Sequence, residues 1–189
     1  WGKMAITMPL HGKMTDLARV RKNTHLALLV ALASAVHTIE AAIPTPFPWL
    51  KFGFANILTI TAISLYGFRA GMTVAFLRVM VGSLIIGSFL TPSFFIGLSG
   101  GIASAVVMGV SYRLFGGILS LVGISVLGAY ASNLAQLATV YFLFIRHTEI
   151  FMLLPVFLGF GLVTGIINGI GSEFLANHIK RLPAFRPVT

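Results

Sequence analysis

Six long apolar segments, separated by short polar or basic turns, dominate the sequence. A membrane-spanning helix needs about 20 mostly apolar residues, and most of the segments reach that length. No alternating pattern recurs at the spacing of a membrane β-barrel. We therefore predict an all-α integral membrane bundle of six transmembrane helices. The predicted helices are Thr24–Ala42, Phe52–Phe68, Ala70–Leu90, Ser93–Leu114, Gly117–Ile145 and Ile150–Ile179.

The composition excludes a soluble domain. The chain of 189 residues is 57% hydrophobic and only 9% charged, whereas soluble domains carry about 25% charged residues. Such a chain cannot cover a globule with polar side chains. Cysteine is absent, so disulfides, thiolate chemistry and Cys-ligated metal are excluded.

The basic residues set the predicted orientation in the membrane. The net charge of +9 would suggest a nucleic-acid partner in a soluble protein, but here the basic residues lie in short loops between apolar segments, and we reject that interpretation. Cytoplasmic loops are enriched in Lys and Arg. With both termini in the cytoplasm, the outer side holds only Lys51 and Arg146. The cytoplasmic side then holds Lys3, Lys13, Arg19, Arg21, Lys22, Arg69, Arg113, Lys180, Arg181 and Arg186.

This orientation gives a simple domain organisation. Residues 1–23 form a basic cytoplasmic segment, residues 24–182 form the transmembrane domain, and residues 183–189 form a cytoplasmic tail. We expect the protein in the cell (inner) membrane, with the lipid bilayer as its first partner.

The charged residues Glu40, Arg78 and Glu173 fall in or near the apolar spans. Such residues are costly in a membrane and are candidates for function. Arg78 lies about 12 Å and Glu173 about 10 Å from the cytoplasmic side, at 1.5 Å per helical residue. Because the depths match and a buried Arg needs a partner, we favour a structural ion pair between them over a ligand site. Glu40, near the outer end of the first helix, is a candidate for function.

Polar side chains also recur at helical spacing on two predicted helices. One set, on the fifth helix, is Tyr130, Asn133 and Gln136; the other, on the sixth, is Thr164, Asn168 and Ser172. Residues at such spacings share one helix face. For the sixth helix we favour hydrogen bonds between helices. For Asn133 and Gln136, which lie in the outer half of their helix, this alternative and ligand binding stay equally open.

Small residues form two further stripes. Ala27, Ala31 and Ala35 recur on the first helix, and Gly161, Gly165 and Gly169 recur on the sixth. Both stripes make flat faces that another helix can approach closely. We assign the glycines to packing inside the bundle. For the alanines, packing inside the bundle and docking of an outside partner stay equally open.

Several chemistries lack their motifs in this sequence. No Gly-rich phosphate loop ends in Lys-Ser/Thr, so the chain does not hydrolyse ATP by itself. No cluster of acids is present to hold magnesium on a diphosphate, and the four acidic residues allow no Ser-His-Asp set. His37 and Glu40 are spaced i, i+3, which is a weak metal signal. We therefore predict no catalytic residue, no metal and no cofactor.

Two stretches resemble a known family. The first is "EAAIPTPFPWLKFGFANILT", from Glu40 to Thr59, and the second is "RVMVGSLIIGSFLTPSFFIGLSGGIAS", from Arg78 to Ser104. Together they are similar to heptaprenyl diphosphate synthase component I, also called the Gx transporter family. That family is similar in layout to the substrate-binding S components of energy-coupling factor transporters.

The resemblance implies a six-helix bundle with a pocket that opens outward. It also implies that the face of Ala27, Ala31 and Ala35 meets a coupling subunit. The prolines after Glu40 end the first helix, since Pro cannot continue one. Because a small-molecule site is usually an apolar cavity with a few converging polar groups, we expect a ligand site there. Its predicted residues are Glu40, Trp49, Lys51, Asn56, Phe94, Asn133 and Gln136.

Three functions remain in competition at this point. The first is a substrate-binding membrane subunit for uptake of a small organic molecule, powered by partner ATPases. The second is a non-transporting membrane subunit of a larger complex linked to isoprenoid or quinone metabolism. The third is an enzyme acting on a lipid diphosphate, which needs a metal site that we do not find in the sequence. The outer polar pocket favours the first function.

Overall fold

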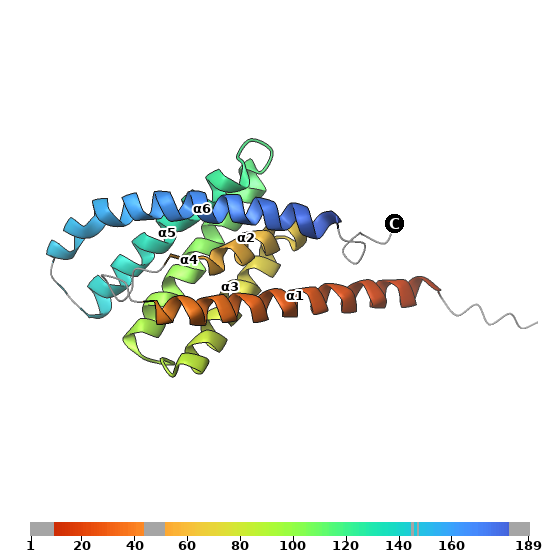
Figure 1. The fold of residues 1–189 in the computed structure, drawn as a ribbon, viewed down its shortest axis with the longest axis horizontal. Coiled ribbons are helices and arrows are strands. Elements are labelled where there is room, and N and C mark those ends of the chain that lie inside the picture. The colour runs from red at the N-terminus through yellow and green to blue at the C-terminus, as the bar shows by residue number, and fades with distance from the viewer. Residues whose placement is uncertain (1–9, 44–51, 145, 147, 182–189) are drawn as a thin grey trace, which may run out of the picture.

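The computed structural model describes residues 10–43, 52–144, 146 and 148–181, and within them the chain is all-α (Figure 1). The helices are α1 (Leu10–Ala42), α2 (Ala55–Tyr66), α3 (Phe68–Ile86), α4 (Pro92–Phe115), α5 (Leu121–Leu143), a 3₁₀ helix η1 (Thr148–Leu153) and α6 (Leu154–Arg181). α5 packs between α4 and α6, and α3 packs between α1 and α4. α2 is inserted among α1, α3, α4 and α6.

The predicted helical membrane fold is confirmed. Five helical stretches are long and apolar enough to cross a membrane, and the second predicted span is the short helix α2. Large apolar side chains are exposed along the outside of the bundle, including Leu84, Ile170 and Phe174. Such a surface suits lipid and not water. The chain is therefore a multi-pass membrane protein.

The observed bounds differ from the predicted ones where backbone geometry intervenes. α2 has only 12 residues, because Gly53 and Gly67 adopt φ of +72° and +86°, which an α-helix does not continue. The last helix begins at Leu154 instead of Ile150, since Pro155 is tolerated only in the first turn of a helix. At the other end, α1 extends through the basic segment back to Leu10, beyond the predicted start at Thr24.

Basic residues at the helix ends lie mostly at one end of the bundle. The first turns of α1 and the last turns of α6 lie at the same end of the bundle (Figure 1). Consecutive helices run in opposite directions. Arg69 at the start of α3 and Arg113 at the end of α4 therefore lie at this same end of the bundle. The termini themselves lie outside the described residues. The assignment of this end to the cytoplasm remains a prediction from the charge distribution.

The glycine stripe of α6 is packing surface, as predicted. A Cβ atom placed on Gly165 would lie 2.7 Å from the Cα of Val126 in α5. A Cβ atom placed on Gly169 would clash in the same way with the Cα of Val122. The neighbours are backbone atoms, which cannot move aside as a flexible side chain can. α5 and α6 therefore approach so closely that only glycine fits between them.

We predict that Gly165→Ala lowers the free energy of unfolding by about 1–3 kcal/mol, because the added methyl overpacks this contact. The control is Gly159→Ala on the same helix, where an added Cβ has no heavy atom within 4 Å. That control should leave stability unchanged or raise it by up to about 1 kcal/mol through helix propensity. Equilibrium unfolding in mixed detergent micelles measures both. Equal effects of the two changes would contradict the close approach of α5 and α6.

Candidate functional site

The start of α2 lies inside the bundle, and Glu40 holds it. Glu40 is in the last turn of α1 and is only 4% exposed. Its Oε1 accepts a hydrogen bond of 2.6 Å from the backbone N–H of Phe54, the N-cap residue of α2. A carboxylate at a helix N-terminus is stabilised by the unpaired N–H groups and the helix dipole. Glu40 thus fixes the position at which α2 begins.

Asn168 holds the backbone just before α2. Its Nδ2 donates to the carbonyl oxygen of Gly53 at 3.0 Å and to that of Phe52 at 3.3 Å. Non-helical backbone at membrane depth is tolerated only where protein or water satisfies its polar groups. Asn168 of α6 supplies that partner from the opposite side to Glu40, and it is itself 2% exposed.

Arg78 completes this group of buried polar residues. It lies in the middle of α3, is 5% exposed, and donates from Nη2 to Oδ1 of Asn56 in the first turn of α2 at 2.6 Å. Glu40 binds the backbone N–H of Phe54 and Arg78 binds Asn56, so both charges lie at the start of α2 and act on each other. A buried charge is costly unless an opposite charge lies near it.

The predicted ion pair between Arg78 and Glu173 is wrong. Glu173 is exposed on α6, one residue beyond the buried Ser172. Successive residues of an α-helix point about 100° apart, so a match in depth did not place the Glu173 carboxylate on the inner face. Arg78 instead donates a hydrogen bond to Asn56, and Glu40 is the acidic residue whose charge acts on it.

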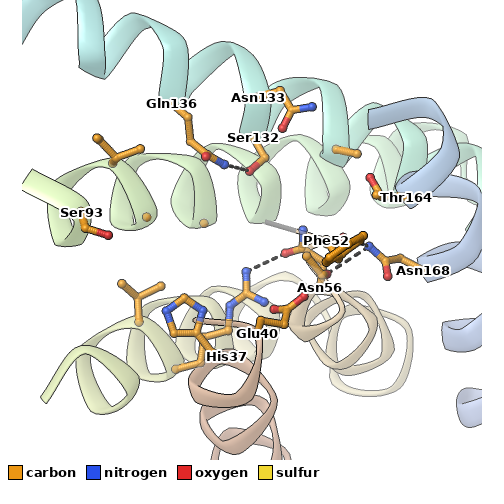
Figure 2. A pocket seen from close by; sticks show the side chains of 17 residues that line it. His37, Glu40, Phe52, Asn56, Ser93, Ser132, Asn133, Gln136, Thr164 and Asn168 are labelled. Carbon is orange, nitrogen blue, oxygen red and sulfur yellow. Dashed lines mark hydrogen bonds between the residues drawn. The ribbon is translucent and has the colours of Figure 1, made fainter. Parts of the chain in front are cut away.

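A polar cavity of about 60 Å³ lies against these residues (Figure 2). Its wall draws on all six α-helices and on the segment before α2. The lining residues are His37, Glu40, Phe52, Gly53, Asn56, Arg78, Val79, Ser93, Ile96, Gly97, Gly101, Ala129, Ser132, Asn133, Gln136, Thr164 and Asn168. They come from the end of α1, the starts of α2 and α4, and the middles of α3, α5 and α6. The cavity thus lies away from the basic end of the bundle, on the side we predict to be outer.

The cavity has two chemically different walls. One wall, from α1 and α3, carries the ionisable residues His37, Glu40 and Arg78. The facing wall, from α5 and α6, carries neutral amides and hydroxyls, and Figure 2 shows Ser132 and Gln136 across from His37 and Glu40. The Nε2 of Gln136 donates to Ser132 Oγ at 2.9 Å along α5.

Glycines make room for the polar side chains of the cavity. A Cβ on Gly82 would lie 2.6 Å from the His37 ring, and one on Gly100 would lie 2.7 Å from Nε2 of Gln136. A Cβ on Gly161 would likewise lie 2.7 Å from Nδ2 of Asn133. Any larger residue would push these side chains out of place, so the glycines define where the polar groups point.

Comparison with known proteins identifies the family. A sequence profile described as heptaprenyl diphosphate synthase component I matches residues 29–175. The chain belongs to the heptaprenyl diphosphate synthase component I family. A solved structure described as "Structure and mechanism of the S component of a bacterial ECF transporter" has the same fold, with a TM-score of 0.57 at 18% identity. The alignment covers 84% of this chain and 99% of the solved one. No curated protein matches the chain significantly.

The structure brings four of the predicted ligand residues to the cavity. Those four are Glu40, Asn56, Asn133 and Gln136. Phe94 does not line it, because its ring is buried against Phe89 at a centroid distance of 5.0 Å. Trp49 and Lys51 lie outside the described residues.

Sequence reasoning missed three main contributors to the cavity. The sequence predicts an ion pair with Glu173 for Arg78 and hydrogen bonds between helices for Asn168. For His37 it gives only a weak metal signal. Asn168 does bond to another part of the chain, but its acceptors are loop carbonyls, and it also lines the cavity. The i, i+3 spacing of His37 and Glu40 was the available signal, since it places both on one face of α1.

The alanines proposed for docking are exposed. Ala27, Ala31 and Ala35 all lie on the outer face of α1. The same helix buries Leu29, Ala33 and Ser34 toward α2 and α3. Among the described residues, no group of three His, Asp or Glu side chains is placed to hold a metal ion.

We predict that Arg78→Met lowers the free energy of unfolding by roughly 3–5 kcal/mol, because it strands the buried Glu40 carboxylate. Adding Glu40→Gln should recover much of the loss, since Gln keeps the acceptor for Phe54 N–H without the charge. Equilibrium unfolding in mixed micelles measures the cycle. Glu173→Gln is the control and should have little effect, because its side chain is exposed. Rescue by Glu173→Gln instead of Glu40→Gln would contradict the observed pairing.

Proposed function

We propose that this chain is the substrate-binding subunit of a membrane uptake system. In this proposal it binds a small organic molecule from the outer side and relies on partner ATPase subunits for energy. The observation that supports this proposal most is the polar cavity. Two buried charged residues and several amides line it, inside an otherwise apolar bundle. A concave site with few convergent polar groups is the usual form of a small-molecule site.

The fold supports this proposal in a second way. The solved structure with the same fold is described as the S component of an ECF transporter. The chain carries no ATP-binding phosphate loop in its sequence, so uptake driven by ATP requires a partner. We propose the cell membrane as the location, with both termini in the cytoplasm, where such ATPases have access to ATP.

The outer face of α1 is our proposed contact for a membrane coupling subunit. Ala27, Ala31 and Ala35 are exposed at four-residue spacing, which leaves a flat strip where a second helix can approach closely. The alternative, a non-transporting subunit of a complex linked to isoprenoid or quinone metabolism, follows the family name. The two functions differ in what co-purifies with the chain and in whether the cavity binds a solute.

We predict that Gly97→Leu abolishes solute binding while the protein stays folded. Gly97 lines the cavity, and an added Cβ has no heavy atom within 4 Å, so a larger side chain enters the space without displacing the wall. Native mass spectrometry after incubation with yeast extract should show a bound small molecule on the wild type and on the control Gly159→Leu. A wild type that binds nothing, or equal binding to Gly97→Leu, would contradict the proposed function.

We predict that Ala31→Leu prevents capture of a membrane coupling subunit without lowering thermal stability. The exposed position tolerates a bulkier side chain, but the strip is no longer flat. Val110→Leu on α4, where the side chain is 46% exposed, is the matched control and should capture the partner normally. Gentle purification from native membranes followed by protein mass spectrometry measures this. Loss of a non-ATPase complex instead would favour the alternative function.

A further inference from the structure

We propose that the cavity takes a small, uncharged molecule that presents hydrogen-bond donors to α5 and α6 and an acceptor to α3. This inference rests on the proposed function and names the chemical class of the solute. It follows from the hydrogen bonds that fix the orientation of the amide groups in the cavity. It also follows from the opposite charges of Arg78 and Glu40 in the facing wall.

The amides of Asn133 and Asn168 have fixed orientations. Nδ2 of Asn133 donates to the carbonyl oxygen of Phe157 at 2.7 Å, and Nδ2 of Asn168 donates to that of Gly53 at 3.0 Å. A carbonyl oxygen only accepts hydrogen bonds, so neither amide can be turned around. The oxygen of each amide is therefore the atom left for other partners. Figure 2 shows the nitrogen of Asn168 directed at the segment of Phe52.

These amide oxygens have no donor within the part of the chain that the structure describes. Oδ1 of Asn168 is buried without a hydrogen-bond partner. Gln136 uses its Nε2 on Ser132 and leaves Oε1 as an acceptor on the same wall. An amide oxygen that loses water without gaining a donor costs about 1–3 kcal/mol. A ligand that brings N–H or O–H groups to this wall removes that cost.

The opposite wall has a hydrogen-bond donor that lacks an acceptor. Nε of Arg78 is a buried donor that no acceptor reaches among the described residues. The opposite charge of Glu40 lies in the same wall, because Glu40 binds Phe54 and Arg78 binds Asn56 at the start of α2. A ligand with a net charge would add an uncompensated charge to a low-dielectric site, which is strongly unfavourable. A neutral acceptor, such as a carbonyl oxygen, suits Arg78 without disturbing this balance.

The space limits the size of the ligand. The cavity of about 60 Å³ holds on the order of five water molecules. This is the space of a single small ring or a short chain. Phe52 lines the cavity and stacks on Phe54 with an interplanar angle of 6°, so the site also offers a flat apolar surface to a ring.

The test uses yeast extract separated by ion exchange into neutral, anionic and cationic fractions. Each fraction is incubated with wild type, Gly97→Leu and the control Gly159→Leu, and bound compounds are detected and identified by native mass spectrometry. We expect binding from the neutral fraction to the wild type and the control, and none to Gly97→Leu. The compound released should be uncharged and should carry at least two N–H or O–H groups.

A second variant tests the donor geometry. Gln136→Leu removes an acceptor oxygen from the amide wall, so the identified neutral compound should bind roughly 5- to 150-fold more weakly in a titration. Gln136→Asn keeps a neutral amide oxygen on the same wall and should weaken that binding less. Equal affinity of wild type and Gln136→Leu would overturn the assignment of donors to this wall. Thermal unfolding of both variants separates this effect from misfolding.

The outcomes separate this inference from the proposed function. If the wild type binds only from the anionic or cationic fraction, and Gly97→Leu does not, the cavity is a solute site but the inferred class is wrong. If a neutral compound without N–H or O–H groups is released, the donor inference is wrong. If no fraction yields a compound that Gly97→Leu excludes, the proposed function fails and this inference fails with it.

Discussion

The hydrogen bond from Phe54 N–H to the Glu40 carboxylate is the interaction on which the rest of the site depends. α2 begins inside the bundle, where its N–H groups have no lipid or bulk water to bind. A buried carboxylate satisfies that end but introduces a charge of its own. Arg78 compensates this charge and binds Asn56 in the first turn of the same helix. The start of one short helix thus accounts for both buried charges.

The cavity follows from the same arrangement. Because α2 has only 12 residues, it does not fill the bundle along its whole length, and the space before it is lined by α4, α5 and α6. Asn168 joins the segment before α2 to α6. Glycines keep α5 and α6 in close contact and leave room for Asn133 and Gln136. The polar groups that support the fold are therefore also the ones that face the cavity, so the proposed solute site needs no separate set of buried polar residues.

Hydropathy predicted the helices, and ionisable residues predicted part of the site. Glu40 stood out because an acid near the end of an apolar span is costly. Asn133 and Gln136 were candidates because they lie in the outer half of their helix, and both line the cavity. Arg78 was misassigned because counting residues gives depth but not the direction in which Glu173 points. The role of Asn168 could not be predicted, since its partners are backbone carbonyls of the non-helical segment before α2, which hydropathy places inside a helix.

The most direct test of the account is an experimental structure of the protein in nanodiscs, determined after incubation with yeast extract. We expect non-water density between the wall of α1 and α3 and the wall of α5 and α6. It should contact the oxygen of Asn133 or Gln136 on one side and Arg78 on the other. Only water in this cavity, together with a small molecule bound elsewhere on the bundle, would contradict the claim that this is the solute site.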